Sequence, residues 1–441
     1  EFINTARLVS KHKPIVAVKS GVTQSGSRAV SSHTGSLAGS EQAYKAAFRQ
    51  AGVLRAESMQ DLFDIALALG YQPLLAGDRI AIITNAGGPG ILATDALERS
   101  GMTLARFKPE TIQALQEYLP DAASAANPVD VLGDARSDRY RKALELVAAD
   151  PNVDGIIVLL TPQAMTEIEL TAESIGEIAD ALEKPILGCF MGEARVSKGI
   201  EILQAKNVPN YSFPERAALA FRAMSDYRRI RQEPLPSFEQ IEGDRATVRQ
   251  ALDRVRAEGR ISIGDAEARE IMVAYGLSIP RSKLAETPDE AVKFAAEIGY
   301  PVVLKIASPD ILHKTDVGGV KVGLRSAGEV RDAFDLMTYR AERYLPEARL
   351  WGCLVQEMAP GGGLEVLVGM NRDPQFGPLV TFGLGGIYVE TLKDVTFRIA
   401  PFSRTEAYEM LTEIRARSLL DGVRGQPPVD KDAIVDTLMR I

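Results

Sequence analysis

Cysteine is nearly absent from this sequence, which holds only Cys189 and Cys353 among its 441 residues. The two lie far apart and form no CxxC motif, so the sequence offers neither a disulfide framework nor a zinc site. Such sparse cysteine is typical of proteins from a reducing compartment. We therefore expect a cytoplasmic location.

Long apolar runs and an excess of positive charge are lacking as well. No run approaches the length that spans a bilayer, and the N-terminus lacks the basic-then-apolar pattern of a signal peptide. The formal net charge of −8 argues against a nucleic-acid-binding protein. We expect neither a membrane nor a nucleic acid among the partners.

What is present is the composition of a globular protein with sizeable cores, because 46% of the residues are hydrophobic and 25% are charged. The length corresponds to roughly three domains of about 150 residues each. The sequence begins at Glu1-Phe2-Ile3, inside what reads as a helix, so we expect a piece of a longer polypeptide.

Strands alternate with helices through the first half of the sequence. This rhythm predicts an α/β fold with a flavodoxin-like, doubly wound parallel sheet. Ligands of such sheets bind at the carboxyl ends of the strands, which are expected to present Asn85, Asp130 and Thr161. The strands are expected at residues 79–84, 155–160 and 185–190, and the helices after them at 91–99, 167–182 and 196–206.

A glycine-rich turn, Asn85-Ala86-Gly87-Gly88-Pro89-Gly90, follows the strand at 79–84. A strand, a glycine loop and a helix are the general arrangement for holding an anion on free backbone N–H groups at the positive end of the helix. We expect Gly87 and Gly88 to do this. The spacing is not GxGxxG, and many such turns are rich in glycine for steric reasons alone.

A single lysine interrupts the apolar strand at 301–306. Lys305 is followed by a polar loop with His313 and by the Gly318-Gly319 pair, which lets backbone N–H groups approach an anion. Lys305 could equally reach water from a strand end, and His313 could be an ordinary turn residue. The scarcity of histidine favours a functional role for His313, because the sequence has only three histidines and another of them, His33, lies in a similar loop of small residues.

The second half differs from the first. Antiparallel strand patterns joined by glycine turns mix with helices after residue 261, including one expected at 404–418, and predict an α+β fold. Residues 231–260 are expected to be a linker carrying a helix at 245–258. The expected domains are 1–75, 76–230 and 261–441, the first and last of them incomplete.

This second half resembles an ATP-grasp domain of the NDP-forming acyl-CoA synthetases, which are relatives of succinyl-CoA synthetase. The resemblance rests on Lys305 in the first strand, the Gln356-Glu357-Met358 hinge, and Glu365 eight residues after Glu357. It implies that Lys305 contacts phosphate oxygens, that the hinge contacts adenine, and that Glu365 holds the ribose.

The first half resembles the succinyl-CoA-ligase-like domains of the same family. Ser32-His33-Thr34-Gly35 matches the loop whose histidine becomes phosphorylated, and residues 84–88 and 127–130 match segments facing the acyl substrate and the phosphohistidine. Residues 312–319 are similar to the ADP-forming acetyl-CoA synthetase branch, in which a second histidine, here His313, relays the phosphoryl group.

Two parts of the family's full chain are expected to lie outside this sequence. One is the N-terminal CoA-binding domain, and the other is the closing strand and aspartate that bind Mg²⁺. No metal ligand is therefore named. Glu390 and Asp394 lie near a glycine loop, but each could equally be a salt-bridged or solvated carboxylate.

The resemblance implies an acid–CoA ligase that interconverts acyl-CoA, ADP and phosphate with a carboxylate, CoA and ATP in the presence of Mg²⁺. Its implied intermediates are an acyl phosphate and a phosphohistidine at His33, with His313 carrying the phosphoryl group onward. A homodimer is expected. Two alternatives stay open: the same activation coupled to a further reaction, or a nucleotide- and acyl-CoA-sensing module of a protein acetyltransferase. The acid, and ADP versus GDP, also stay open.

Overall fold

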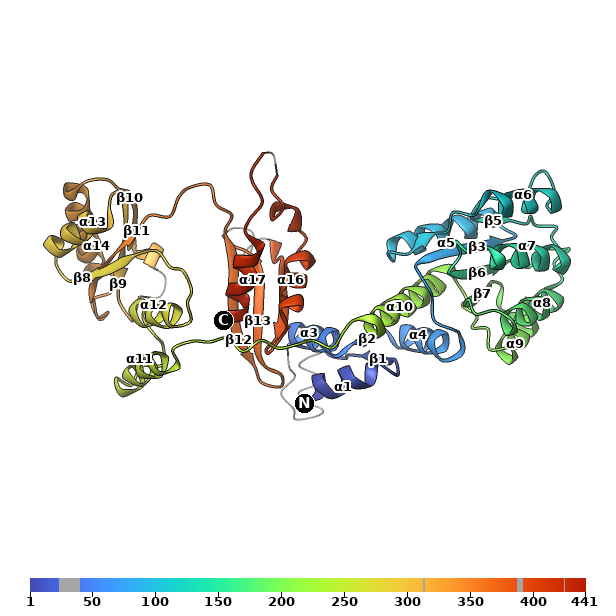
Figure 1. Cartoon of the computed structure of the whole chain (residues 1–441), viewed down its shortest axis with the longest axis horizontal. Coiled ribbons are helices and arrows are strands. Elements are labelled where there is room, and N and C mark those ends of the chain that lie inside the picture. The colour runs from blue at the N-terminus through green and yellow to red at the C-terminus, as the bar shows by residue number, and fades with distance from the viewer. Residues whose placement is uncertain (24–39, 312–313, 387–391, 424) are drawn as a thin grey trace. The chain divides into compact units, whose positions relative to one another are not determined.

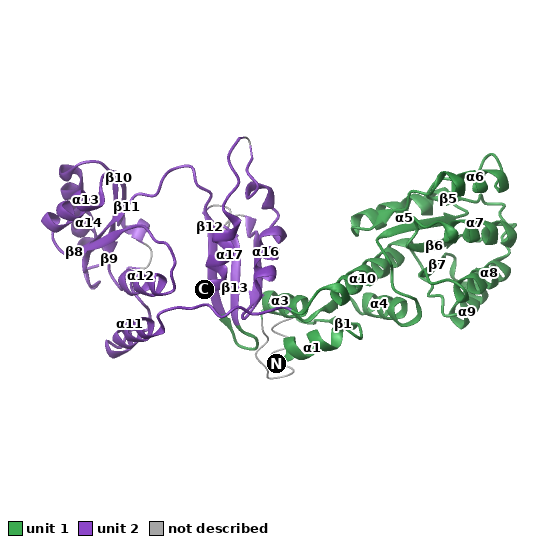
Figure 2. Cartoon of the chain, in the orientation of Figure 1, with its two compact units in different colours: residues 1–235, 372–377 green, residues 236–371, 378–441 purple. Residues whose placement is uncertain are grey.

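The computed structural model describes residues 1–23, 40–311, 314–386, 392–423 and 425–441. They form two compact units: unit 1 consists of residues 1–235 and 372–377, and unit 2 of residues 236–371 and 378–441 (Figure 2). None of the helices within these ranges combines the length and apolar character of a membrane span.

The start of unit 1 is a small layer of helices around two parallel strands. Ile15 of β1 pairs with Val53 of β2. Helix α3 is capped by Ser40, whose Oγ accepts the N–H of Ala43 at 3.2 Å, and it ends at Gly52 in the left-handed conformation. The elements are α1 (Phe2–Ser10), β1 (Ile15–Val18), α3 (Glu41–Ala51), β2 (Val53–Ala56) and α4 (Met59–Tyr71).

A five-stranded sheet forms the core of the rest of unit 1 (Figure 1). Its order is β4-β3-β6-β7, with β5 beside β3, and every pairing is parallel. The strands are β3 (Arg79–Thr84), β4 (Thr103–Leu104), β5 (Val129–Asp130), β6 (Gly155–Leu160) and β7 (Ile186–Phe190). The helices are α5 (Gly87–Arg99), α6 (Pro109–Tyr118), α7 (Ser137–Ala149), α8 (Ile168–Asp180), α9 (Ser197–Ala205) and α10 (Pro214–Gln232).

Helices cover both faces of this sheet. Ala81 and Ile83 pack in one cluster with residues of α7 and α8, whereas Ile80 and Ile82 pack in another with residues of α5 and α10. Alternation of side chains along β3 therefore fills two separate cores, as a doubly wound sheet requires. The predicted flavodoxin-like class is confirmed.

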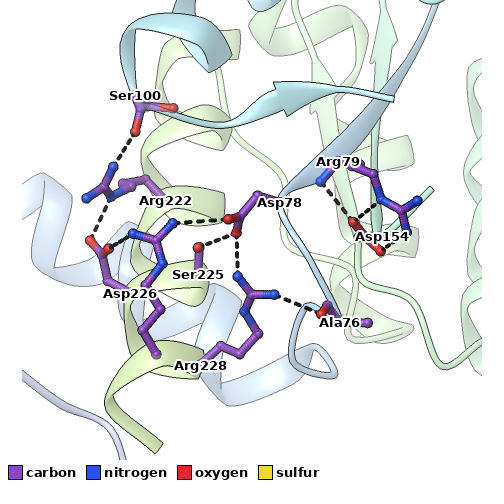
Figure 3. A network of polar contacts seen from close by, with 10 residues as sticks. Ala76, Asp78, Arg79, Ser100, Asp154, Arg222, Ser225, Asp226 and Arg228 are labelled. Carbon is purple, nitrogen blue, oxygen red and sulfur yellow. Dashed lines mark hydrogen bonds and ion pairs between the residues drawn. The ribbon is translucent and has the colours of Figure 1, made fainter. Parts of the chain in front are cut away.

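A polar network fastens α10 to the start of β3 (Figure 3). Asp78 accepts hydrogen bonds from Ser225, from Arg228 at 2.7 Å and from Arg229 at 3.0 Å. Burial opposes the charge on Asp78, but the Ser225 and Arg229 hydrogen bonds and the charge of Arg228 outweigh it, so its pKa lies below the usual value. The network fixes the strand that leads to the glycine turn.

Unit 2 contains two antiparallel sheets, with strand orders β10-β9-β11-β8 and β12-β13-β14. The first has α13 and α14 on one face, as an α+β fold predicts. The strands are β8 (Ser282–Ala285), β9 (Val302–Ala307), β10 (Val320–Leu324), β11 (Gly352–Glu357), β12 (Val366–Asp373), β13 (Gly377–Leu384) and β14 (Val395–Ile399). The helices are α11 (Arg245–Ala257), α12 (Asp265–Ala274), α13 (Pro288–Ile298), α14 (Ala327–Tyr344), α16 (Arg404–Glu413) and α17 (Lys431–Arg440).

Two helix boundaries differ from the prediction by four residues or more. Helix α5 begins at Gly87 instead of residue 91, because Pro89 suits the first turn, where no N–H is needed. Helix α16 ends before residue 418, since the Asp394 carboxylate accepts the N–H groups of Arg415 and Ala416, both at 2.8 Å, and draws the chain out of the helix. β2, α6 and α17 were not predicted.

Candidate functional site

The carboxyl ends of β3 and β6 are joined by the side chain of Asn85, which is 2% exposed. Its Nδ2 donates to the Thr161 carbonyl at 2.8 Å, and its Oδ1 accepts from the Thr161 N–H at 2.9 Å and hydroxyl at 3.1 Å. The structure thus brings these two predicted residues together. Both the oxygen and the nitrogen of the Asn85 side-chain amide thus bond to Thr161 and hold the strand ends, so its role is to position the turn that follows.

The start of α5 is open. No side chain of a described residue caps this helix, so its first N–H groups are unpaired. A Cβ on Gly87 would lie 3.6 Å from Asp130 Oδ2, and a Cβ on Gly88 would have no atom within 4 Å. The other oxygen of Asp130 accepts the Leu132 N–H at 2.9 Å. The site therefore combines an anion-attracting helix start with a carboxylate that can accept a hydrogen bond.

Two residues of this site were missed as candidates. Gln163 donates from Nε2 to Thr161 Oγ1 at 3.3 Å and reaches toward Gly133, although its place after Thr161-Pro162 at a strand end was a usable signal. Tyr140 is buried beneath the turn and donates to the Leu159 carbonyl at 2.9 Å. Burial raises the pKa of Tyr140 well above its usual value, so this phenol stays neutral.

Lys305 lies on the face of the four-stranded sheet opposite to α13 and α14. Val302, Leu304 and Ile306 of the same strand pack against those helices, and alternation sends Lys305 the other way. Lys305 faces Leu354 of β11, and Gln356 lies two residues farther along that strand. Lys305 and Gln356 therefore share one face, which we call the open face.

The amino group of Lys305 makes no ion pair or hydrogen bond to any described residue. Burial lowers its pKa; Asp265 opposes this, while the charges of Lys314 and Arg269 lower it further. Asp265 is already occupied, because Lys314 Nζ lies 2.9 Å from its Oδ2. Lys305 is thus a half-buried cation without a partner in the described chain, which is the arrangement that an anionic ligand completes.

The hinge is held by Arg281. The Glu357 N–H donates to the Arg281 carbonyl at 2.8 Å, and the Glu357 carboxylate accepts from the backbone N–H and Nε of Arg281, both at 3.2 Å. These hydrogen bonds lower the pKa of Glu357. Met358 follows the strand and is 38% exposed.

Glu365 packs against the glycine turn after β13. Its carbonyl accepts the Gly385 N–H at 2.7 Å, and a Cβ on Gly386 would lie 2.7 Å from its Oε2. Any side chain at residue 386 would displace the Glu365 carboxylate. The two glycines therefore keep room for this carboxylate beside the turn.

An open cavity of about 710 Å³ lies between the helices α11 and α12 and the chain entering β8. Its volume is within the range of about 300–1,000 Å³ typical of small-molecule sites. Arg269, Val273, Pro280 and Ser282 are among its lining residues. Ser282 is paired with Gln356 of β11, but neither Gln356 nor Lys305 lines the cavity. The predicted linker helix thus forms part of a pocket.

Some of the predicted site residues lie outside the described residues, namely His33, His313 and Glu390. Within the described ranges, no group of three or more His, Cys, Asp or Glu side chains could hold a metal ion. Metal ligands are therefore not assigned.

Comparison with known families divides the chain into three matched regions. Residues 1–69 match the succinyl-CoA ligase like flavodoxin domain, residues 80–234 the Ligase-CoA domain, and residues 254–441 the ATP-grasp domain. The predicted fold class, including the ATP-grasp part, agrees with these matches.

Individual proteins similar to this chain are ADP-forming acetate–CoA ligases. The chain is 43% identical to acetate–CoA ligase [ADP-forming] I of Archaeoglobus fulgidus, over 100% of this chain and 63% of that protein. It is 48% identical to acetate–CoA ligase [ADP-forming] I subunit beta of Pyrococcus furiosus, over 44% of this chain and 84% of that subunit. The chain thus spans less than two thirds of the length of the Archaeoglobus relative.

A solved structure is also similar. It is that of Ca. Korarchaeum cryptofilum dinucleotide forming acetyl-coenzyme A synthetase 1 in complex with phosphate and ADP. The sequence identity is 36%, the match covers 52% of this chain and 50% of that chain, and the TM-score is 0.50.

Proposed function

The chain belongs to the family of ADP-forming acetate–CoA ligases, and on that premise we propose that it interconverts acyl-CoA, ADP and phosphate with a carboxylate, CoA and ATP. One observation carries the proposal. In the part of the chain that the structure describes, no side chain caps the helix start at Gly87 and Gly88, and no residue pairs with the half-buried Lys305 on its open sheet face. The helix start can bind phosphate oxygens through its backbone N–H groups, and Lys305 can bind them through its positive charge.

The nucleotide is proposed to bind on the open face. Lys305 neutralises phosphate oxygens, while Gln356, the Glu357–Met358 backbone and Glu365 hold the base and ribose. A divalent cation bound with the nucleotide would spread the phosphate charge further, as in other phosphoryl transfers. Catalysis here is positioning and charge neutralisation.

The chemistry is proposed to begin when a phosphate oxygen attacks the thioester carbon. The C–S bond breaks, and CoA leaves as the thiolate and takes a proton. A neutral imidazole nitrogen of His33 then attacks phosphorus, the P–O bond to the acyl group breaks, and the carboxylate leaves. Imidazole suits this step because its pKa of about 6.5 leaves a free lone pair at neutral pH.

The glycine turn is proposed to hold the phosphorylated imidazole. Gly87 and Gly88 offer N–H groups to the phosphoryl oxygens at the positive end of α5. The Asp130 carboxylate accepts the remaining imidazole N–H and keeps the ring oriented. Asn85 and Thr161 keep this turn in place. A nitrogen of His313 then attacks the phosphorus, and the P–N bond to His33 breaks. A terminal oxygen of ADP attacks the same phosphorus in turn, the P–N bond to His313 breaks, and ATP forms.

Phosphohistidine mapping tests the proposal. The protein is incubated with labelled ATP and Mg²⁺, and acid-labile, base-stable phosphate is located by mass spectrometry. We expect label at His33, loss of acyl-CoA synthesis in His33→Ala with nucleotide binding retained, and loss of His33 labelling in His313→Ala. Substantial acyl-CoA synthesis by His33→Ala would reject the scheme.

The homodimer and the cytoplasmic location stay predictions, and the identity of the acid stays open. The acid is to be identified by assaying thioester formation over a panel of carboxylic acids. The homodimer is to be tested by sedimentation, and the cytoplasmic location by fractionation of cells.

A further inference from the structure

We propose that the turn at residues 372–377 is a positioning element for His33, because it is joined to both ends of the chain segment in which His33 lies. That segment runs from Lys19, directly after β1, to Ser40, the cap of α3. The turn belongs to unit 1, although its neighbours in the sequence belong to unit 2 (Figure 2). The inference rests on the proposed function, since it concerns the phosphorylation of the same histidine.

The first step is the bond between the turn and the start of α3. Oδ2 of Asp373 accepts the backbone N–H of Ser40 at 3.1 Å and the Ser40 hydroxyl at 3.3 Å. The oxygen of the same hydroxyl accepts the N–H of Ala43 at 3.2 Å. Ser40 therefore bonds to the turn and to its own helix at once. The point at which the His33 segment enters α3 is fixed from both sides.

The second step is the choice of residue at position 373. Asp373 is 6% exposed, and its Oδ1 accepts the N–H groups of Gln375 at 2.9 Å and Phe376 at 3.0 Å, which shapes the turn. Burial opposes its charge, but the hydrogen bonds from Gln375, Phe376 and Ser40 outweigh this and lower its pKa. Asparagine would form the same turn with one oxygen. The second oxygen of the carboxylate is what binds Ser40.

The third step is the other end of the segment. The Phe376 and Tyr44 rings meet edge to face, with centroids 5.0 Å apart and an interplanar angle of 85°. The ammonium group of Lys19 lies 4.6 Å from the centroid of the same Tyr44 ring. Ring pairs of this geometry and cation–π contacts are both favourable. Lys19 before the segment and Ser40 after it are thus linked to one turn.

The fourth step is what this does for the histidine. Tyr44 packs on the core cluster around Phe48, so the turn is held against a packed part of unit 1. Phosphoryl transfer requires the two reacting atoms to meet in a narrow range of positions. A histidine whose segment is anchored at both ends reaches that range more often than one whose segment is anchored at neither. Asp373 and Phe376 are therefore positioning residues.

The rate of labelling at His33 tests this role. The protein is mixed with labelled ATP and Mg²⁺, the reaction is quenched at short times, and acid-labile phosphate at His33 is counted. Asp373→Asn keeps the Oδ1 acceptor of the turn but presents an NH₂ group to the Ser40 N–H, so it breaks the link selectively. We expect labelling to slow about tenfold. ADP affinity, measured by calorimetry, should stay unchanged, which also shows that the variant is folded.

A matched control separates the link from the loss of a helix cap. Ser58 caps α4, the next helix of unit 1, and its Oγ accepts the N–H of Asp61 at 3.1 Å. Ser58→Ala removes this cap and should label at the wild-type rate. Ser40→Ala removes a similar cap together with the hydroxyl that donates to Asp373, and should label more slowly. Ser40→Thr keeps the hydroxyl and should restore the rate.

A second variant approaches the turn from its aromatic side. Phe376→Leu removes the ring contact with Tyr44 and leaves the Asp373 carboxylate in place. It should slow labelling about threefold with ADP affinity retained, because one of the two ends is released. The test therefore does not depend on Asp373→Asn alone.

The outcomes are distinct. Labelling at the wild-type rate in Asp373→Asn, Ser40→Ala and Phe376→Leu overturns the positioning role and leaves the proposed function intact. Equal slowing in Ser58→Ala overturns the role too, because any lost helix cap would then have the same effect. A loss of ADP affinity that matches the slowing also overturns it, since the turn would then act on the nucleotide. A wild-type protein that gains no label at His33 overturns the proposed function itself, and the positioning role with it.

Discussion

Replacing Asn85 by alanine should loosen the joined ends of β3 and β6 without emptying the core. The substitution deletes one hydrogen bond that Asn85 donates and two that it accepts, all with Thr161. Each hydrogen bond contributes about 1 kcal/mol, so the free energy of local opening of this region should fall by about 3 kcal/mol. Because Asn85 is 2% exposed, water does not fully replace the lost partners.

Hydrogen exchange on the intact protein measures this locally. Amides in a peptide that covers β6 should exchange about a hundredfold faster in Asn85→Ala, since each tenfold change corresponds to about 1.4 kcal/mol. Peptides that cover β9 and β11, in unit 2, should not change.

Gln163→Ala is the control for Asn85→Ala. It removes only an exposed 3.3 Å hydrogen bond to the same Thr161 hydroxyl and should alter exchange by less than about threefold. If Asn85→Ala left exchange in β6 at the wild-type rate, the positioning role assigned to Asn85 would be wrong.

Other predictions concern unit 2 and the network at β3. Gly319→Ala should lower the melting temperature by calorimetry, since its Cβ would lie 2.7 Å from Ile306 Cγ2, whereas Gly363→Ala, with nothing within 4 Å, should not. Asp78→Asn should cost about 2 kcal/mol in urea unfolding at pH 7. Folding lowers the pKa of Asp78, so its carboxylate stabilises the folded state fully at a pH above the usual carboxyl pKa. This stabilisation is lost as the pH falls through the lowered pKa of the folded state. The difference in unfolding free energy between the wild type and Asp78→Asn should therefore vanish at that low pH. The lowered pKa of Lys305 means that nucleotide affinity, measured by calorimetry, should fall as the pH rises through a value below 10.5, and Lys305→Met should lack this dependence.

Local patterns predicted much of the architecture. The apolar run around Lys305 requires a strand, and alternation alone sends this lysine away from Leu304 and Ile306. The glycines at 87 and 88 and the strand before them predicted a strand–turn–helix unit. Such inferences succeed because they depend on neighbours in the sequence.

Contacts between distant segments were not predictable in the same way. Asn85 was placed correctly at a strand end, but its bonds to Thr161 depend on the parallel pairing of β3 with β6, which no local pattern encodes. The cavity beside Val273 depends on how two helices pack near β8. The early end of α16 depends on Asp394, which lies on another element.

Trp351 gives this protein an optical property that follows from its packing. It is the only tryptophan in the chain, its ring lies 5.5 Å from the Arg260 guanidinium, and a Cβ on Gly264 would lie 2.9 Å from it. Emission on excitation of indole therefore comes from one position, at the base of α12. Any event that moves this helix end should change its intensity or colour, so no dye has to be attached.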